Sequence, residues 1–112
     1  MLINKNYYQI LTEQTALHPD KDAIVMGDKR VTYRQLIANI DSVSSYLVNN
    51  GVKKNDYIVL WGTPSPEWLC TYFGIIHAGG VAVCLNSNYT INDVTPLVTF
   101  ADSKYVLFGA TH

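Results

Sequence analysis

The turn Gly62-Thr63-Pro64-Ser65 is one of three places in the sequence where chemistry could occur. It follows an apolar run and precedes a helical pattern, which is where backbone amides of an α/β unit can hold a phosphate. A dinucleotide fingerprint needs three spaced glycines, and a P-loop needs Gly-Lys-Ser/Thr. This turn has one glycine, and Pro64 and Pro66 remove amide donors. We therefore favour a plain capped turn, with an anion site as the alternative.

The second place is a set of possible metal ligands. Cys70 and His77 are seven residues apart and can share one helical face, which Cys84 could approach from the next strand. A zinc site would need a fourth ligand or a recognised spacing, and the sequence offers neither. We expect core residues instead, with His77 hydrogen-bonded near the helix end. The two cysteines are too few and too far apart for a disulfide framework, so we expect two reduced core thiols.

The third place is a concentration of aromatic residues: Trp61, Trp68, Tyr72 and Phe73. They could line a pocket for an acyl or aryl group, but such clusters more often form core, which is the interpretation we favour. No serine or cysteine has a motif that places a histidine base beside it, so nucleophilic catalysis has no support. The residues by themselves predict a fold, and none of them is assigned as catalytic, cofactor-binding or metal-ligating.

Composition sets the class of protein. The chain has 112 residues, 8 basic and 9 acidic side chains, a formal net charge of −1 and 48% hydrophobic residues. This length fits a single domain, so we expect residues 1–112 to form one α/β subdomain. The near-neutral charge, without a block of like charge, argues against a nucleic-acid partner. The segment Met1–Gln9 lacks an apolar signal region, so we expect a cytoplasmic protein in which the sequon Asn88-Tyr89-Thr90 is a polar loop.

One stretch raises a membrane alternative, because no Asp, Glu, Lys or Arg occurs between Glu67 and Asp93. A spanning helix needs about 20 continuous apolar residues, and Gly79-Gly80 interrupts this stretch. A buried helix followed by a buried strand explains the same residues better. We therefore expect no membrane span.

The N-terminal half predicts two helices around a hairpin. Helical spacing of apolar residues predicts a helix over Tyr7–Leu17. Two strand-like runs, Ala23–Met26 and Arg30–Thr32, flank the turn-forming segment Gly27-Asp28-Lys29 and predict a β-hairpin. The capping-box spacing of Thr32 and Gln35 then starts a helix over Tyr33–Asn50, which Gly51 ends.

The C-terminal half alternates strands and helices. The predicted elements are a strand buried on both faces at Tyr57–Trp61, a helix from Ser65 to Ala78, a second buried strand at Val81–Leu85, a helix from Thr90 to Ala101 and a third strand at Lys104–Phe108. Short links between alternating strands and helices are typical of a doubly wound, mainly parallel α/β sheet with right-handed crossovers.

Four motifs occur in a familiar order. They are Val31-Thr32-Tyr33-Arg34-Gln35-Leu36, Gly51-Val52-Lys53-Lys54-Asn55-Asp56, Pro64-Ser65-Pro66-Glu67-Trp68, and the run from Gly74 through His77-Ala78-Gly79-Gly80 to Asn86. In this the chain resembles the opening of an adenylate-forming enzyme, the superfamily of acyl-CoA synthetases, luciferases and nonribosomal peptide synthetase adenylation domains. The resemblance extends from the first helix to Phe108 and implies a partial N-terminal subdomain of the acetyl-CoA-synthetase-like fold. The sequence His77-Ala78-Gly79 resembles the acyl-CoA or aryl-CoA synthetase branch more than the peptide-synthetase branch.

Two residues depart from the family pattern. Asn55 stands where glycine is usual in a Gly-Asp turn, and Cys84 stands where proline is common before Leu-Asn. Asparagine tolerates the left-handed turn conformation, and cysteine packs as a small hydrophobe. Neither change threatens the predicted fold.

The resemblance implies a parent enzyme that activates a carboxylic acid with ATP and magnesium, then passes the acyl group to CoA or a carrier phosphopantetheine. That chemistry uses a Ser/Thr/Gly-rich phosphate loop with a lysine, a glutamate for magnesium, an aspartate for the ribose and a late catalytic lysine. The six lysines here lie outside any such loop: Lys5, Lys21, Lys29, Lys53, Lys54 and Lys104. No catalytic or nucleotide-contacting residue is therefore carried over.

We expect an N-terminal fragment of an AMP-forming acid–thiol ligase that is inactive alone. Because its sheet would be built for neighbours, we expect exposed apolar surface and either self-association or pairing with the remainder of the adenylation domain. Two alternatives stay open. One is a small non-enzymatic, flavodoxin-like binding module, and the other is one half of a split enzyme that acts through a partner chain.

Overall fold

The computed structural model describes residues 6–101 and 105–108. Its elements in chain order are α1 (Tyr7–Leu17), β1 (Asp22–Met26), β2 (Lys29–Thr32), α2 (Tyr33–Asn49), β3 (Tyr57–Trp61), α3 (Pro66–His77), β4 (Val81–Leu85), α4 (Ile91–Ala101) and β5 (Tyr105–Phe108). Each predicted helix and strand is confirmed, with ends that differ by about a residue. Lys104, the predicted first residue of the last strand, lies outside the described residues.

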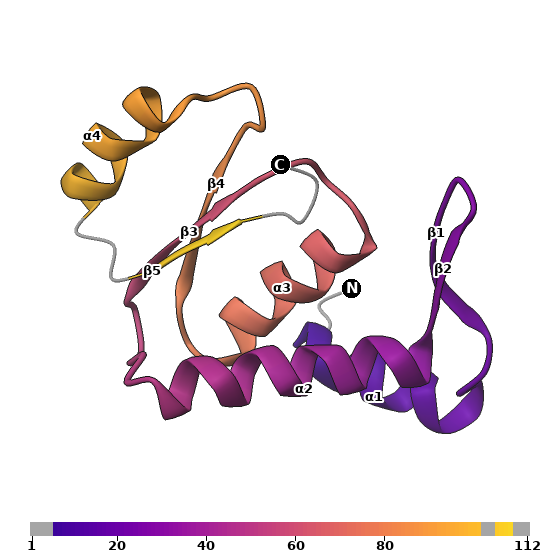
Figure 1. The fold of residues 1–112 in the computed structure, drawn as a ribbon. Coiled ribbons are helices and arrows are strands. Elements are labelled where there is room, and N and C mark those ends of the chain that lie inside the picture. The colour runs from indigo at the N-terminus through magenta and orange to yellow at the C-terminus, as the bar shows by residue number, and fades with distance from the viewer. Residues whose placement is uncertain (1–5, 102–104, 109–112) are drawn as a thin grey trace, which may run out of the picture.

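The three C-terminal strands form a parallel sheet in the order β4-β3-β5. The chain moves from β3 to its neighbour β4 through α3, and then passes back across β3 to reach β5 through α4. This reversal places α3 and α4 on opposite faces of the sheet (Figure 1). The predicted doubly wound parallel sheet is confirmed. The hairpin β1-β2 forms a separate antiparallel sheet beside it.

The central strand β3 supplies the core on both sides. Ile58 and Leu60 pack with Leu47 of α2 and Ile75 of α3, while Val59 and Trp61 face the other way. On that second face Val94 of α4 covers the strand. Successive side chains of a strand point to opposite faces, so one five-residue run serves two hydrophobic clusters.

Strand β4 differs from its prediction as a buried strand. It lies at one end of the sheet, where Val81 is 40% exposed and Cys84 is also exposed. Both β3 and β4 are continuous apolar runs, but among the strands that the structure describes only β3 has a neighbour on each side. The apolar run at Val81–Leu85 therefore correctly predicted a strand, but the prediction that this strand is fully buried was wrong.

Helices α1 and α2 and the hairpin meet around a third cluster, which contains Leu36, Ile40 and Cys70. The predicted capping box at the start of α2 is present, with Thr32 and Gln35 each bonding the other's backbone N–H. Helix α1 has no fully buried residue, and two tyrosine hydroxyls attach it to its neighbours. Tyr7 donates to the Phe73 carbonyl at 2.8 Å, and Tyr8 donates to the Asp41 carboxylate at 2.7 Å.

Among the described residues, no helix is long and apolar enough to cross a membrane. The uncharged stretch between Glu67 and Asp93 instead folds as most of α3, strand β4 and the loop that leads to α4.

Candidate functional site

The carboxyl ends of β3 and β4 lie at the same edge of the parallel sheet, which is where doubly wound folds hold their ligands. Two hydrogen bonds join the loops that follow these strands. The Trp61 indole N–H donates to the Asn86 carbonyl at 3.1 Å, and the Gly62 N–H donates to the Leu85 carbonyl at 3.4 Å. This edge is therefore the first position to test for a ligand site.

The turn over Gly62–Ser65 proves to be the capped turn that we favoured. The Ser65 hydroxyl accepts the Trp68 N–H at 3.0 Å, and Pro66 occupies the first turn of α3. Glu67 places a carboxylate at the positive end of the helix dipole. The Nζ atom of Lys29 lies 3.7 Å from Oε2 of this carboxylate. The pKa of the Glu67 carboxyl is lowered, mainly because the carboxylate accepts a hydrogen bond from the Glu67 backbone N–H. The chain's own groups thus occupy the position that an anion would take.

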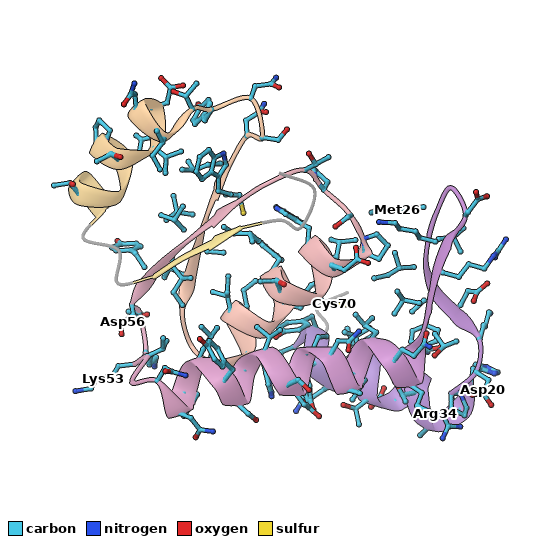
Figure 2. All side chains as sticks on the ribbon, viewed as in Figure 1. Asp20, Met26, Arg34, Lys53, Asp56 and Cys70 are labelled. Carbon is cyan, nitrogen blue, oxygen red and sulfur yellow. The ribbon has the colours of Figure 1, made fainter. Side chains whose placement is uncertain are left out.

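The three predicted metal-ligand candidates do not converge. Cys70 is buried in the cluster between α2 and α3 (Figure 2), where the Asn39 amide nitrogen lies 3.8 Å from its sulfur and burial raises the pKa of its thiol. His77 lies at the surface, and Cys84 is exposed on β4. In the part of the chain that the structure describes, no group of three or more His, Cys, Asp or Glu side chains could hold a metal ion.

Two of those predictions are corrected. Both cysteines are unpaired thiols, but only Cys70 belongs to the core, because Cys84 is on the edge strand. His77 was expected in the core with a hydrogen bond. Its imidazole instead stacks on the Tyr8 ring with centroids 3.9 Å apart, and its Nε2 lies 4.0 Å from Asp41 Oδ1.

The sheet separates the aromatic residues into two groups. Trp61 faces α4, whereas Trp68 and Tyr72 stack at 5.5 Å on α3, which covers the opposite face. The Phe73 ring packs 5.1 Å from Tyr7 of α1. The four residues therefore do not line one acyl pocket, and the core interpretation is the better one. The Trp68 indole nitrogen is buried without a hydrogen-bond partner in the described structure.

Sequence reasoning missed one open pocket between β2 and the first half of α2. Its volume is about 350 Å³, and Arg30, Val31, Gln35, Ala38 and Asn39 line it. Each of its three polar side chains already has a partner within the chain: Arg30 pairs with an aspartate, Gln35 caps α2 and Asn39 contacts a sulfur. These residues belong to ordinary strand and helix patterns, so the sequence carried no signal for the pocket. Its chemistry points to no ligand.

Two of the four family-like motifs meet in the structure. The turn between α2 and β3, where Figure 2 labels Lys53 and Asp56, packs against the glycine pair that joins α3 to β4. The Asn55 N–H donates to the Gly79 carbonyl at 2.8 Å, and the Val81 N–H donates to the Asp56 carbonyl at 2.8 Å. Asn55 has a φ of 70°, which confirms the left-handed conformation expected of a residue that replaces glycine.

The two glycines of this contact are favoured for different reasons, Gly80 by the space around it and Gly79 by its left-handed backbone angle. A Cβ on Gly80 would lie 3.0 Å from Ile58 Cδ1, and one on Gly79, whose φ is +91°, would lie 3.4 Å from the Cα of Lys54. Two of the motifs that carry the family resemblance therefore hold these turns together.

Comparison with known proteins decides the family. A sequence profile described as "AMP-binding enzyme" matches residues 11–112. The chain belongs to this family. The chain is similar to the long-chain-fatty-acid–CoA ligase of Bacillus subtilis (strain 168). The two are 31% identical over 93 residues, which are 83% of this chain and 17% of the ligase. It is also similar to gramicidin S synthase 2 of Brevibacillus brevis, with 34% identity over 86 residues, covering 77% of this chain and 2% of the synthase.

The fold matches a solved structure of the same family. The inhibitor-bound N-terminal domain of FACL13 from Mycobacterium tuberculosis superimposes with a TM-score of 0.82 and 30% identity, covering 95% of this chain and 27% of that one. The chain thus spans less than a fifth of the length of the ligase and about a quarter of the length of the FACL13 domain.

A nucleotide, which the family description implies, does not fit the described residues at the carboxyl edge of the sheet. The Gly62 N–H is already used, Pro64 and Pro66 have no N–H to give, and Glu67 would repel a phosphate. No nucleotide contact is therefore assigned to these residues.

Proposed function

We propose that this chain is the N-terminal part of an AMP-forming acid–thiol ligase, and that residues 1–112 form one α/β subdomain without catalytic activity of its own. One observation carries the proposal: the fold and family match extend over almost the whole chain, yet the chain covers 17% of a fatty-acid–CoA ligase and 27% of the FACL13 domain. The motifs within it join turns and pack glycines against neighbouring elements.

The complete ligase would join a carboxylic acid to a thiol in two steps. The carboxylate oxygen attacks the α-phosphorus of ATP and pyrophosphate leaves, with magnesium balancing the phosphate charge. The acceptor thiol then attacks the acyl carbonyl carbon and AMP leaves. Relatives named as CoA ligases and one named gramicidin S synthase 2 both match this chain, and we propose CoA or a carrier-bound phosphopantetheine as the acceptor.

In that enzyme the residues described here would act as a scaffold. Strand β3 is the buried centre of a parallel sheet, and the linked turns after α2 and α3 fix where β3 and β4 begin. The groups that bind ATP and move protons would come from the remainder of the adenylation domain, which is the proposed partner. We place the protein in the cytoplasm, a proposal that its two unpaired thiols support.

An activity measurement tests the proposal. Residues 1–112 are mixed with ATP, magnesium and a panel of aliphatic and aromatic carboxylic acids, and acid-dependent exchange of labelled pyrophosphate into ATP is measured. The expected rate equals the background without enzyme. Exchange above that background would refute the view that this part is inactive.

A binding measurement tests the rival function, a non-enzymatic flavodoxin-like module. Calorimetric titration of the same chain with ATP, AMP and flavin mononucleotide should give no saturable heat, because the α3 N-terminus is occupied by Ser65 and Glu67. Saturable binding of any of these ligands would favour the rival.

A further inference from the structure

Asn50 and Gly51 form the only Asn-Gly pair in the sequence, and they lie where α2 ends. Asparagine is one of the thermolabile residues. The backbone nitrogen of the next residue can attack its side-chain amide carbon, and glycine has no Cβ to hinder that attack. Both residues are exposed, and a Cβ built on Gly51 would meet no described atom within 4 Å. Water therefore reaches this pair, which is a candidate site of covalent change.

The end of α2 is a Schellman motif, which holds the attacking nitrogen. The Gly51 N–H donates to the Val48 carbonyl at 3.0 Å, and the Val52 N–H donates to the Leu47 carbonyl at 3.0 Å. Leu47 and Val52 are buried in the same cluster, which gives the motif its usual hydrophobic contact. Gly51 has a φ of 93°, the left-handed conformation that the motif requires.

The side-chain amide of Asn50 is held as well. Its Nδ2 donates to the Tyr46 carbonyl at 2.7 Å, one turn earlier in α2. Attack on Asn50 Cγ requires the Gly51 nitrogen to lose its proton and the amide to turn towards that nitrogen. Both hydrogen bonds must break for this to happen. The reaction therefore needs the last turn of α2 to open first.

We propose that Asn50 is a site of self-modification, which reacts only when the last turn of α2 opens. The Gly51 nitrogen, after giving its proton to a base in solution, bonds to Asn50 Cγ. The Cγ–Nδ2 bond breaks, and Nδ2 takes a proton from water and leaves as ammonia. Water then opens the cyclic imide. Addition at Cγ yields aspartate, and addition at the main-chain carbonyl carbon yields isoaspartate. The net change consumes a water molecule and releases ammonia.

Either product fits the helix end less well than asparagine does. Aspartate replaces the Nδ2 donor by a carboxylate, which would face the Tyr46 carbonyl at the negative end of the helix dipole. Isoaspartate adds a methylene to the main chain before Gly51, so the Gly51 and Val52 N–H groups lose their register with the carbonyls of α2. The modification therefore keeps the turn open and loosens the connection from α2 to β3 (Figure 1).

Mass spectrometry of peptides measures the reaction. The chain is incubated in mildly alkaline buffer, with and without guanidinium chloride, and the mass gained when NH₂ is replaced by OH is followed at Asn50. The rate in denaturant should exceed the native rate by at least about tenfold, the factor that two ordinary hydrogen bonds together supply. Asn49 is also exposed but precedes an asparagine, so it is the internal control and should convert more slowly than Asn50 in denaturant.

Two valine-to-alanine variants test whether the helix end controls the rate. Val52→Ala removes part of the buried contact with Leu47, so it should raise the native rate at Asn50 by about tenfold. Hydrogen exchange of the Gly51 amide should rise by the same factor, because both reactions need the same opening. Val48→Ala is the matched control. Val48 is 52% exposed, so this variant should leave the native rate within about twofold.

The variants Asn50→Asp and Asn50→Ser test the consequence. Asn50→Asp supplies the aspartate product from the start, so the Gly51 and Val52 amides should exchange about tenfold faster than in the unmutated chain. Asn50→Ser lacks the charge and should show a smaller increase. Unchanged exchange in Asn50→Asp would contradict the proposed loosening of the turn.

The remaining outcomes decide the site and its control. The inference is wrong if Asn50 converts as fast in the native chain as in denaturant, if Asn49 converts first, or if the two valine variants have equal effects. If circular dichroism shows that Val52→Ala is unfolded, the unmutated chain at low denaturant concentrations decides, since conversion of Asn50 and exchange of Gly51 should rise together there. None of these measurements involves acid activation, so their results leave the proposed function untouched.

Discussion

The close crossing of α2 and α3 at Gly74 gives the sharpest stability prediction. A Cβ built on Gly74 would lie 2.5 Å from both Cβ and Cγ1 of Val43. Carbon atoms in good contact are about 3.5–4.0 Å apart, so the two atoms would be too close by about 1 Å or more. Both Cβ atoms are fixed to helical backbones, so no rotamer change removes the clash. Gly74→Ala must therefore push the two helices apart and loosen the packing around Ile40 and Ile75.

The size of this effect follows from two opposing terms. Overpacking of a well-filled contact costs about 1–3 kcal/mol, and we expect the upper end here because the clash involves backbone-fixed atoms. Replacing glycine by alanine inside a helix contributes about 1 kcal/mol in the other direction. The net expectation is that Gly74→Ala lowers the free energy of unfolding by about 2 kcal/mol. That is a large part of the stability of a typical domain, which is about 5–15 kcal/mol.

Urea unfolding followed by circular dichroism measures the effect in three backgrounds. In the Val43→Gly background the clash is gone, so adding Gly74→Ala should stabilise the chain by about 1 kcal/mol through helix propensity alone. Val43→Ala removes Cγ1 and keeps Cβ, so it should rescue only in part. The coupling between Gly74→Ala and Val43→Gly is then about 3 kcal/mol. An equal effect of Gly74→Ala in all three backgrounds, or a stabilising effect in the unmutated chain, would refute the packing argument.

Three further predictions concern a turn, a hydroxyl and the thiols. Asn55, at a φ of 70°, should tolerate glycine within about 0.5 kcal/mol, whereas Asn55→Ala should cost about 1 kcal/mol in urea unfolding. Burial, and then the neighbouring tyrosine, raise the pKa of Tyr7 to about 12, so its neutral hydroxyl stabilises the fold fully below pH 10.0 and this contribution is lost as pH rises towards 12. Tyr7→Phe should therefore flatten the loss of thermal stability over that range. A colorimetric thiol assay should count Cys84 alone in the native chain and Cys70 as well in denaturant.

Each of these has a clear contrary result. Equal stabilities for Asn55→Gly and Asn55→Ala would mean that the left-handed angle carries no cost. An unchanged alkaline slope in Tyr7→Phe would remove that hydroxyl from the pH dependence. Rapid reaction of both thiols in the native chain would contradict the buried position of Cys70.

The elements could be predicted because their signals are local. The helix starts at Thr32, Ser65 and Thr90 are each set by a side chain that bonds a backbone N–H three residues later. Such caps lie within a few residues of the sequence, so their spacing is enough to find them. The left-handed turn at Asn55 was predictable from the family resemblance, because asparagine stands where that pattern has glycine.

The order of the strands was not predictable in this way. Tyr57–Trp61 and Val81–Leu85 are both continuous apolar runs of five residues, and periodicity cannot distinguish a central strand from an edge strand. Their difference arises from long-range pairing, because β5 joins β3 rather than β4. The exposure of Cys84 follows from that choice.

The candidate sites failed where they depended on three-dimensional convergence. Cys70 and His77 share a helix, but one lies in the core and the other stacks on α1. Trp61 and Trp68 are close in sequence, yet the sheet lies between them. In contrast, the family motifs correctly marked Asn55 and Gly79 as residues of interest. They did not reveal that the two residues contact each other, because the turns that hold them are far apart in the sequence.

The reading frame downstream of codon 112 tests the central claim most directly. If this chain is the opening part of an acid-activating ligase, sequencing of the native transcript should show that the frame continues into a segment rich in serine, threonine and glycine that ends in Lys-Gly. A frame that stops after His112, in a genome that encodes no complementary half, would contradict the claim.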